Sequence, residues 1–109
     1  MALPGTDLPR KHGIYIPLPP PVVAKARTVN NSLTSSTAVD VTLNASTTFL
    51  EVHAIDAGIF MRYQASATSS NFDEYIAAGT LRHYVKPQAA TVVSFIADTS
   101  TAKLRFIEK

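Results

Sequence analysis

Apolar and polar residues alternate with a period of two along much of the chain. Val39, Val41 and Leu43 are separated by Asp40 and Thr42, so one face of this segment is apolar and the other is polar. Such alternation is typical of a β-strand that buries one face. This pattern, or a less regular run rich in β-branched and aromatic residues, predicts strands over residues 22–29, 39–43, 49–55, 59–64, 81–85, 91–97 and 102–107.

Clusters of small polar residues separate these segments and predict turns. We expect a turn at Asn30, Asn31 and Ser32, after the first strand, and another over residues 44–47. Residues 72–78 are open to two interpretations, a short strand or a single helical turn. The pattern therefore predicts an all-β fold, a single antiparallel β-sandwich or barrel-like domain of seven to eight short strands over residues 22–109.

The first 21 residues differ from the rest of the chain in their proline content. Proline fixes its own φ angle, lacks an N–H group and favours an extended conformation in the residue before it. We therefore expect residues 1–21 to form an extended proline-rich N-terminal arm, which packs either on a neighbouring protein or on its own domain. Six of the seven prolines lie in this segment: Pro4, Pro9, Pro17, Pro19, Pro20 and Pro21.

Composition adds two constraints. The chain has 109 residues, enough for one domain, and it has no cysteine, which excludes disulfides and cysteine-based chemistry. Its formal net charge of +2 is unevenly distributed. Residues 1–31 hold four basic groups against one acidic group, a net of +3, whereas the rest holds six against seven, a net of −1. The basic character belongs to the arm, but four charges are too sparse for a typical nucleic-acid patch.

No pattern of residues indicates catalysis, a cofactor or a metal site. His12, His53 and His83 are far apart, and none has the spacing of a two-ligand metal motif. His53 and His83 could meet across a sheet, although strand histidines are more often solvent-facing. Asp73 and Glu74 are adjacent and would point to opposite faces of a strand. We expect the protein not to be an enzyme, with no catalytic, cofactor-binding or metal-binding residues.

Three binding interpretations remain weaker than a structural one. Aromatic residues alternate with basic ones over residues 60–63 and 82–84, which suits base stacking, but any half-buried strand shows this alternation. Residues 17–21 could serve as a polyproline ligand, although no arginine flanks them suitably. Residues 65–71 form a polar loop that could bind carbohydrate, although it has no tryptophan.

The order and spacing of strands over residues 38–109 resemble those of the small β-sandwich structural proteins of tailed bacteriophages, over about two-thirds of the chain. The arm does not belong to the matched pattern. The residues that carry the resemblance are a Ser/Thr-rich lead into 39–43, the strands 49–54 and 59–63, a polar loop leading to 76–80, and the strands 92–97 and 102–108.

This resemblance implies a viral structural protein, a phage capsid decoration or cement protein that stabilises the shell through inter-subunit contacts and arm exchange. It would be found in the virion, after assembly in the host cytoplasm. Its expected partners are other copies of itself, with a trimer as the expected homo-oligomer, and virion proteins such as the major capsid protein. Neither a membrane nor nucleic acid is an expected partner. The residues expected to make the arm's protein contacts are Leu3, Leu8, Arg10, Lys11, Ile14, Tyr15, Ile16 and Leu18.

Two alternatives remain for the role. One is a neck, tail or fibre component, which the same strand pattern fits equally well. The other is a carbohydrate-binding or ligand-binding β module that uses exposed loops such as residues 65–71.

Overall fold

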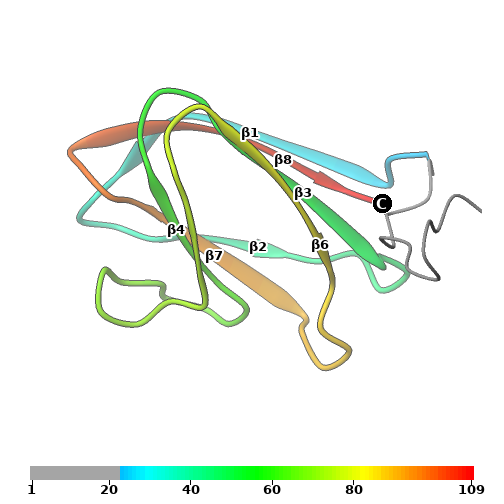
Figure 1. Ribbon diagram of the computed structural model, residues 1–109. Coiled ribbons are helices and arrows are strands. Elements are labelled where there is room, and N and C mark those ends of the chain that lie inside the picture. The colour runs from blue at the N-terminus through cyan, green and yellow to red at the C-terminus, as the bar shows by residue number, and fades with distance from the viewer. Residues whose placement is uncertain (1–22) are drawn as a thin grey trace, which may run out of the picture.

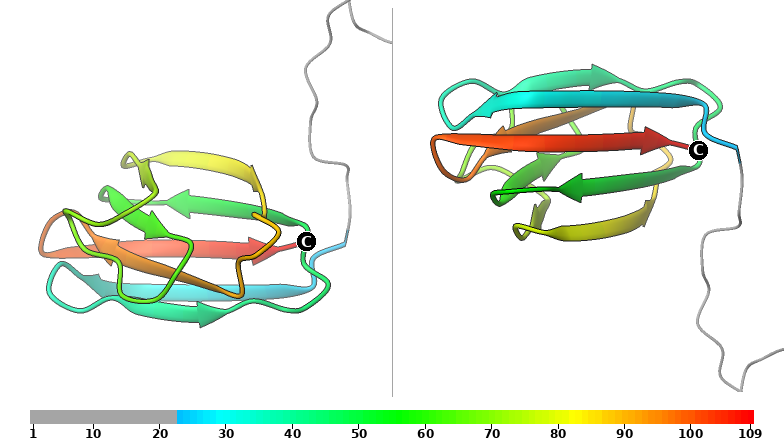
Figure 2. Two further views of the ribbon diagram at one scale, coloured as in Figure 1. Left: turned by 90° about the horizontal axis from the view of Figure 1, so that it is seen from below. Right: turned by 90° about the horizontal axis from the view of Figure 1, so that it is seen from above.

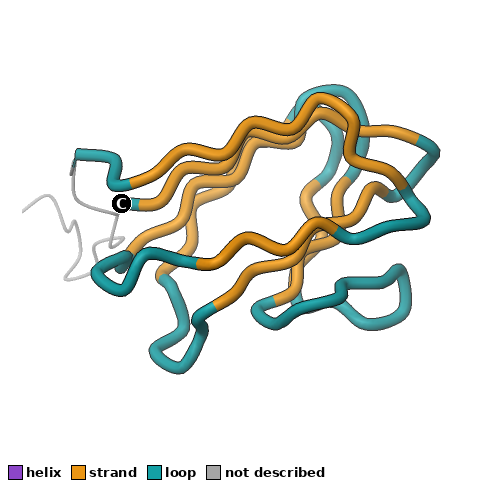
Figure 3. Tube along the Cα trace, turned by 180° about the vertical axis from the view of Figure 1, so that it is seen from behind, coloured by secondary structure: helices purple, strands orange, loops and turns teal. Residues whose placement is uncertain are grey.

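The computed structural model describes residues 23–109, and these form two antiparallel four-stranded sheets packed face to face (Figures 1 and 3). The expected arm, residues 1–21, lies outside the described residues. No helix occurs within residues 23–109. The strands are β1 (Ala26–Thr34), β2 (Val39–Thr42), β3 (Phe49–Ala54), β4 (Ile59–Arg62), β5 (Glu74–Ile76), β6 (Thr80–Val85), β7 (Val92–Ala97) and β8 (Thr101–Glu108).

The strand order identifies the topology. One sheet has the order β1-β8-β3-β6, which Figure 2 shows side by side, and the other has the order β2-β7-β4-β5. Every connection crosses from one sheet to the other, except the one from β4 to β5. The first and last strands are neighbours. This is the arrangement of an eight-stranded jelly roll, in which two Greek keys close into a sandwich. The prediction of an all-β sandwich is therefore confirmed.

The hydrophobic core lies between the two sheets, where the alternating apolar residues meet. Leu50, Val52 and Ala54 of β3 are all fully buried, as their period-two spacing predicts. The rings of Phe95 on β7 and Phe106 on β8 meet edge to face, with centroids 5.0 Å apart, so they join the two sheets directly. Further core side chains are Leu33, Ile59, Met61, Ile76, Val93, Ala102 and Leu104.

The predicted first strand is present, but its predicted bounds and the turn expected after it were wrong. Strand β1 begins at Ala26 rather than at residue 22, and it continues through Asn30, Asn31 and Ser32 to Thr34. The Asn–Asn–Ser sequence forms an irregularity within the strand, because the register with β8 shifts between Asn30 and Leu33. The Asn30 side chain accepts a hydrogen bond from the Ser32 N–H, at 2.8 Å, in the manner of a local turn. Pairing with β8 and burial of Leu33 extend the strand past this point.

The two interpretations of residues 72–78 are resolved in favour of a strand. Residues 74–76 form β5, which pairs with β4 through Ile59 opposite Ile76 and Phe60 opposite Tyr75. Asp73 does not start a helix. Its carboxylate accepts a hydrogen bond from the Tyr63 N–H at 2.8 Å, which joins the two ends of the β4–β5 loop.

The Tyr75 side chain approaches the backbone closely at Gly58. A Cβ atom at this position would collide with the hydroxyl end of Tyr75, which lies on the outer face of β5. The Tyr75 hydroxyl also donates a hydrogen bond to Asp98 at 2.9 Å. A side chain at position 58 would therefore push Tyr75 away from Asp98.

We expect Asp98→Asn to lower the pKa of Tyr75. The hydrogen bond to Asp98 raises the pKa of Tyr75 above its ordinary value of 10.0, with smaller contributions from burial and from the carboxylate charge. A tyrosine with a raised pKa adds stability that is present below its ordinary pKa and is lost as pH rises through the raised pKa. Absorbance titration of tyrosinate, with Tyr75→Phe to isolate this residue, measures the change. Unchanged titration in Asp98→Asn would contradict the proposed hydrogen bond.

Candidate interaction surfaces

The residues that were predicted to make the arm's contacts all lie outside the described residues. They are Leu3, Leu8, Arg10, Lys11, Ile14, Tyr15, Ile16 and Leu18. Their role stays a prediction. The structure does describe the part of the domain from which the arm extends. It also describes a groove and the outer faces of both sheets, which are the candidate surfaces for binding another chain.

The arm joins the domain at one end of the sandwich, which we call the arm end. Here the Lys25 N–H donates to the carbonyl of Glu108 at 2.6 Å, so the start of β1 lies beside the C-terminus (Figure 1). The β2–β3 and β6–β7 loops lie at the same end, because Thr48 bonds both Lys109 and Lys86 through the backbone. Val23, the first described residue, is 87% exposed.

A buried carboxylate holds the arm end together. Glu108 is only 2% exposed, and its Oε1 atom accepts hydrogen bonds from the Asn44 N–H at 2.7 Å and from the Thr47 hydroxyl at 2.9 Å. These bonds attach the β2–β3 loop to the last strand. A buried charge is stable only when it is hydrogen-bonded in this way.

The β4–β5 loop folds back over the outer face of the second sheet. The Ser66 N–H donates to Asp40 at 3.1 Å and the Ala67 N–H donates to the Ser94 hydroxyl at 2.8 Å. Ser66 has a positive φ of 64°, which is uncommon for a residue other than glycine. Much of the loop that was considered for carbohydrate binding is therefore anchored to the domain, although residues 68–71 remain exposed.

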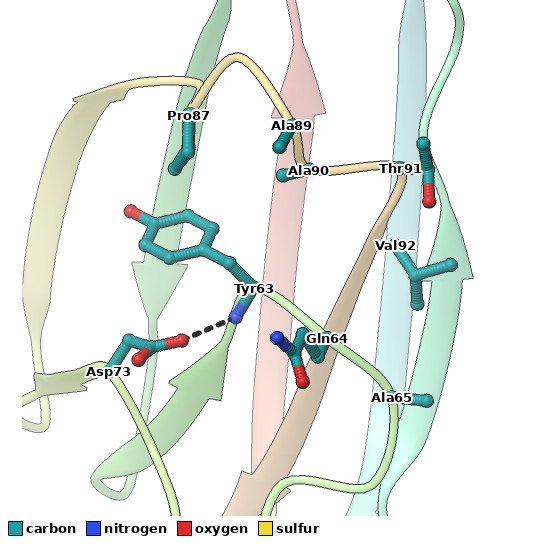
Figure 4. A pocket seen from close by; sticks show the side chains of 9 residues that line it. All are labelled: Tyr63, Gln64, Ala65, Asp73, Pro87, Ala89, Ala90, Thr91 and Val92. Carbon is teal, nitrogen blue, oxygen red and sulfur yellow. Dashed lines mark hydrogen bonds between the residues drawn. The ribbon is translucent and has the colours of Figure 1, made fainter.

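A groove opens at the arm end between the β4–β5 and β6–β7 loops, and we call it the Tyr63 groove. Its volume is about 490 Å³, which falls in the range of small-ligand pockets. The Tyr63 ring lies next to Pro87, and Asp73 and Gln64 lie on either side of Tyr63 (Figure 4). The full lining consists of Tyr63, Gln64, Ala65, Asp73, Pro87, Ala89, Ala90, Thr91 and Val92.

Two sets of hydrogen bonds keep the walls of this groove in place. Asp73 accepts from the Tyr63 N–H, as described above. On the other side, the Lys86 ammonium donates to the carbonyls of Pro87 at 3.1 Å and Ala90 at 3.0 Å, which closes the β6–β7 loop around it. The groove is therefore largely preformed.

The hydroxyl of Tyr63 stays protonated at neutral pH and is available as a hydrogen-bond donor. Burial raises the pKa of Tyr63 well above its ordinary value of 10.0. Electrostatic interactions with Glu74, Tyr84 and Asp73 raise this pKa further. No residue within 23–109 hydrogen-bonds this hydroxyl. A solvent-accessible donor that lacks a protein partner is suited to binding an acceptor on a ligand.

The outer face of the first sheet combines an ion cluster with exposed apolar side chains. Glu51 on β3 contacts the His83 ring at 2.9 Å and the Lys109 ammonium at 3.1 Å. Burial by itself would raise the pKa of Glu51, but hydrogen bonds and charge from Lys109 and His83 outweigh this and hold the pKa below 4.5. Val85 and Leu81 flank His83 on the edge strand β6, and both are exposed.

We expect Glu51→Gln to destabilise the domain by about 0.5–1 kcal/mol at pH 7, a modest amount because the pair is near the surface. A carboxylate with a lowered pKa adds stability that is present above its ordinary pKa of 4.5 and is lost as pH falls through the lowered value. The difference between wild type and Glu51→Gln should therefore shrink below about pH 4. Urea denaturation from pH 3 to pH 8 measures it, and a constant difference would contradict the ion cluster.

Within the described residues, His53 and His83 do not share a metal site. His53 is paired with Leu81 and His83 with Glu51, and the pair of Val52 with Arg82 lies between these two pairs. Within residues 23–109, no group of three or more histidine, aspartate, glutamate or cysteine side chains is placed to hold a metal ion. His12 lies outside the described residues.

The outer face of the second sheet carries an aromatic cluster. The centroid of the Phe60 ring lies 4.5 Å from that of Phe72 and 5.1 Å from that of Tyr75. Both outer rings are exposed to solvent. Exposed aromatic clusters of this kind are common at binding surfaces, because aromatic rings gain much from desolvation and lose little side-chain entropy.

The sequence interpretation missed the Tyr63 groove. Tyr63 follows Ile59 and Met61 on the apolar face of its strand, and it does pack partly against the core. Strand alternation therefore explained it as a core residue. Its second role depends on the β6–β7 loop, which lies more than 20 residues away in the chain. The one signal available in the sequence was an aromatic residue placed where a strand runs into a polar loop.

The chain matches no protein-family model, no curated protein and no solved structure. Within the described residues, no helix is long and apolar enough to cross a membrane.

Proposed function

We propose that this protein is a virion structural protein, a phage capsid decoration or cement protein that joins neighbouring subunits. The observation that carries the proposal is that a jelly-roll domain continues, at an exposed Val23, into a proline-rich, apolar N-terminal segment. Jelly rolls are common in viral capsid proteins, which makes the role consistent with the fold without requiring it. The segment provides the means to hold a second protein.

The exposed apolar side chains support an assembly role. Val29, Leu81 and Val85 lie on the first sheet, Tyr75 lies on the second, and Phe72 lies in the loop just before β5. Burying such surface against another subunit contributes roughly 25 cal/mol per Å², before the cost of association is subtracted. A small domain with limited core volume gains stability from such contacts. The expected partners are other copies, as a trimer, and the major capsid protein.

Co-sedimentation tests the capsid role. The full chain is mixed with undecorated heads of the phage that encodes it, and the pellet is compared with that of Ile14→Ser/Ile16→Ser, which removes two large apolar side chains from the arm. We expect the full chain to pellet with heads and the double variant to bind much less. Thr6→Ser is the matched control within the arm. If the chain stays in the supernatant while another virion protein binds the same heads, a capsid role is excluded, and a neck, tail or fibre role remains.

The aromatic cluster Phe60, Phe72 and Tyr75 favours a second candidate, a carbohydrate-binding module. Aromatic faces can pack against the apolar face of a sugar ring, and Asp98, which accepts from Tyr75, adds a polar group beside them. A glycan array with the full chain tests this role. Clear hits that are lost in Phe72→Ala, and kept in Val29→Ala on the opposite sheet, would support it over a purely structural role.

A further inference from the structure

We propose that the Tyr63 groove is the receptor for the proline-rich segment, residues 17–21, of a neighbouring copy of this chain. This inference rests on the proposed assembly function and deepens it, because it names the surface that the arm binds. The segment reads Pro17, Leu18, Pro19, Pro20 and Pro21.

The hydrogen-bonding groups of the groove match those of a proline-rich peptide. Proline has a carbonyl acceptor but no N–H donor, and a polyproline II helix forms no internal hydrogen bonds. Such a segment therefore presents acceptors and few donors. The groove offers the Tyr63 hydroxyl, the Gln64 amide and the Thr91 hydroxyl, all of which can donate.

The shape and apolar lining of the groove also fit this occupant. Recognition of polyproline segments uses grooves lined by aromatic rings, against which proline rings pack. Here the Tyr63 ring and Pro87 form one wall, and Ala89 and Ala90 leave space opposite, because their side chains are small (Figure 4). One turn of a polyproline II helix is about 9 Å long, from three residues at 3.1 Å each. Both partners are stiff, so binding orders few side chains.

Charges of opposite sign lie on the arm and beside the groove. Residues 1–21 hold Arg10 and Lys11 against Asp7, a net charge of +1. Asp73 lines the groove and Glu74 is the next residue. Arg10 and Lys11 lie six or seven residues before Pro17, so in an extended arm they reach about 20 Å beyond the bound segment and contact the neighbouring surface. Attraction of this kind mainly raises the association rate.

The occupant comes from a neighbouring copy rather than from the same chain. Val23 is 87% exposed and stands only two residues after Pro21 in the sequence. Three consecutive prolines before this point are stiff and disfavour a tight reversal. Exchange of arms between copies therefore needs no sharp bend next to the domain.

The absence of cysteine from the chain allows a clean test by disulfide trapping in the full-length protein. Leu18→Cys protein is mixed with Ala89→Cys protein in a glutathione redox buffer, and disulfide-linked heterodimer is followed on non-reducing gels. The control replaces Ala89→Cys with Thr99→Cys, an exposed loop position at the far end of the sandwich. We expect heterodimer to form about tenfold faster with Ala89→Cys, because docking raises the effective concentration of the two thiols.

Two results would overturn the inference. One is an equal rate with Ala89→Cys and Thr99→Cys, which means that the segment does not prefer the groove. The other is a disulfide that forms only within a chain carrying both Leu18→Cys and Ala89→Cys, which means that the arm binds its own domain. Tyr63→Phe on the Ala89→Cys chain removes only the hydroxyl, and we expect it to reduce the preference several-fold; an unchanged preference would contradict the role given to that donor.

The same reagents separate this inference from the proposed function. Suppose that heads bind the chain normally, but disulfide trapping is no faster with Ala89→Cys than with Thr99→Cys. This result would exclude the Tyr63 groove as the receptor and would leave the capsid role in place. Specific trapping without any binding to heads would support the groove and argue against a capsid role.

Discussion

Phe95→Ala is expected to be the most destabilising single substitution considered for this domain, at about 3–5 kcal/mol. Phe95 is fully buried on β7, and its ring packs edge to face on Phe106 of β8. Alanine loses the transfer free energy of the ring and leaves a cavity between the two sheets. Because small domains are stable by only about 5–15 kcal/mol in total, much of the variant should be unfolded in moderate urea.

Equilibrium urea denaturation, followed by circular dichroism, measures this effect. Val29→Ala is the matched control, since Val29 is an apolar strand residue that is largely exposed on the outer face of β1. We expect it to change stability by no more than about 0.5 kcal/mol. A loss below about 2 kcal/mol in Phe95→Ala would mean that the two sheets do not pack as described, since burial of this ring is central to their contact.

Glu108→Ala should have the second largest effect, a loss of about 2–3 kcal/mol, because hydrogen bonds to a charged group contribute more than neutral ones. The Glu108 carboxylate is buried and accepts from the Asn44 N–H and the Thr47 hydroxyl. Alanine leaves the buried Thr47 hydroxyl without its acceptor. It also frees the β2–β3 loop from the last strand, at the end of the domain where the arm begins.

Glu108→Gln separates the effect of the hydrogen-bond acceptor from the effect of the negative charge, because glutamine keeps an oxygen but is uncharged. Glutamine keeps one oxygen acceptor in nearly the same place, so we expect it to retain a large part of the stability. Hydrogen exchange at the Asn44 amide should be fast in Glu108→Ala and intermediate in Glu108→Gln. Equal losses in the two variants would show that the charge, rather than the acceptor geometry, is what matters at this site.

In the proposed docking, hydrogen bonds at the arm end keep the Tyr63 groove rigid before the arm binds. The Glu108 hydrogen bonds fix the β2–β3 loop, and the Lys86 ammonium closes the β6–β7 loop that forms one wall of the Tyr63 groove. A groove that is rigid before binding loses little entropy when it accepts a stiff segment. In an assembly, each domain would present a groove and contribute a proline-rich segment, so the contact is heterologous and can close into a ring around a symmetry axis.

Much of the fold could be predicted from local patterns. The alternation of Val39, Val41 and Leu43, and that of Leu50, Val52 and Ala54, matches strands whose one face is buried. The turn prediction failed at Asn30, Asn31 and Ser32, because β1 pairs with β8 on both sides of this stretch, at Asn30 opposite Leu104 and at Leu33 opposite Ala102. The preference of Asn and Ser residues for turns is weak, and strand pairing together with burial of Leu33 outweighs it.

The sequence contained the strand pattern, the separate proline-rich segment and its positive charge, since each depends on residues that are close in the chain. The partners of each strand, the buried position of Glu108 and the Tyr63 groove depend on residues far apart in the chain, which come together when the sheets pack. The alternation within a strand indicates which of its faces is buried, but not which other strands that face packs against. The packing partners are set by the whole core, because burial energy is shared among all the strands that meet there.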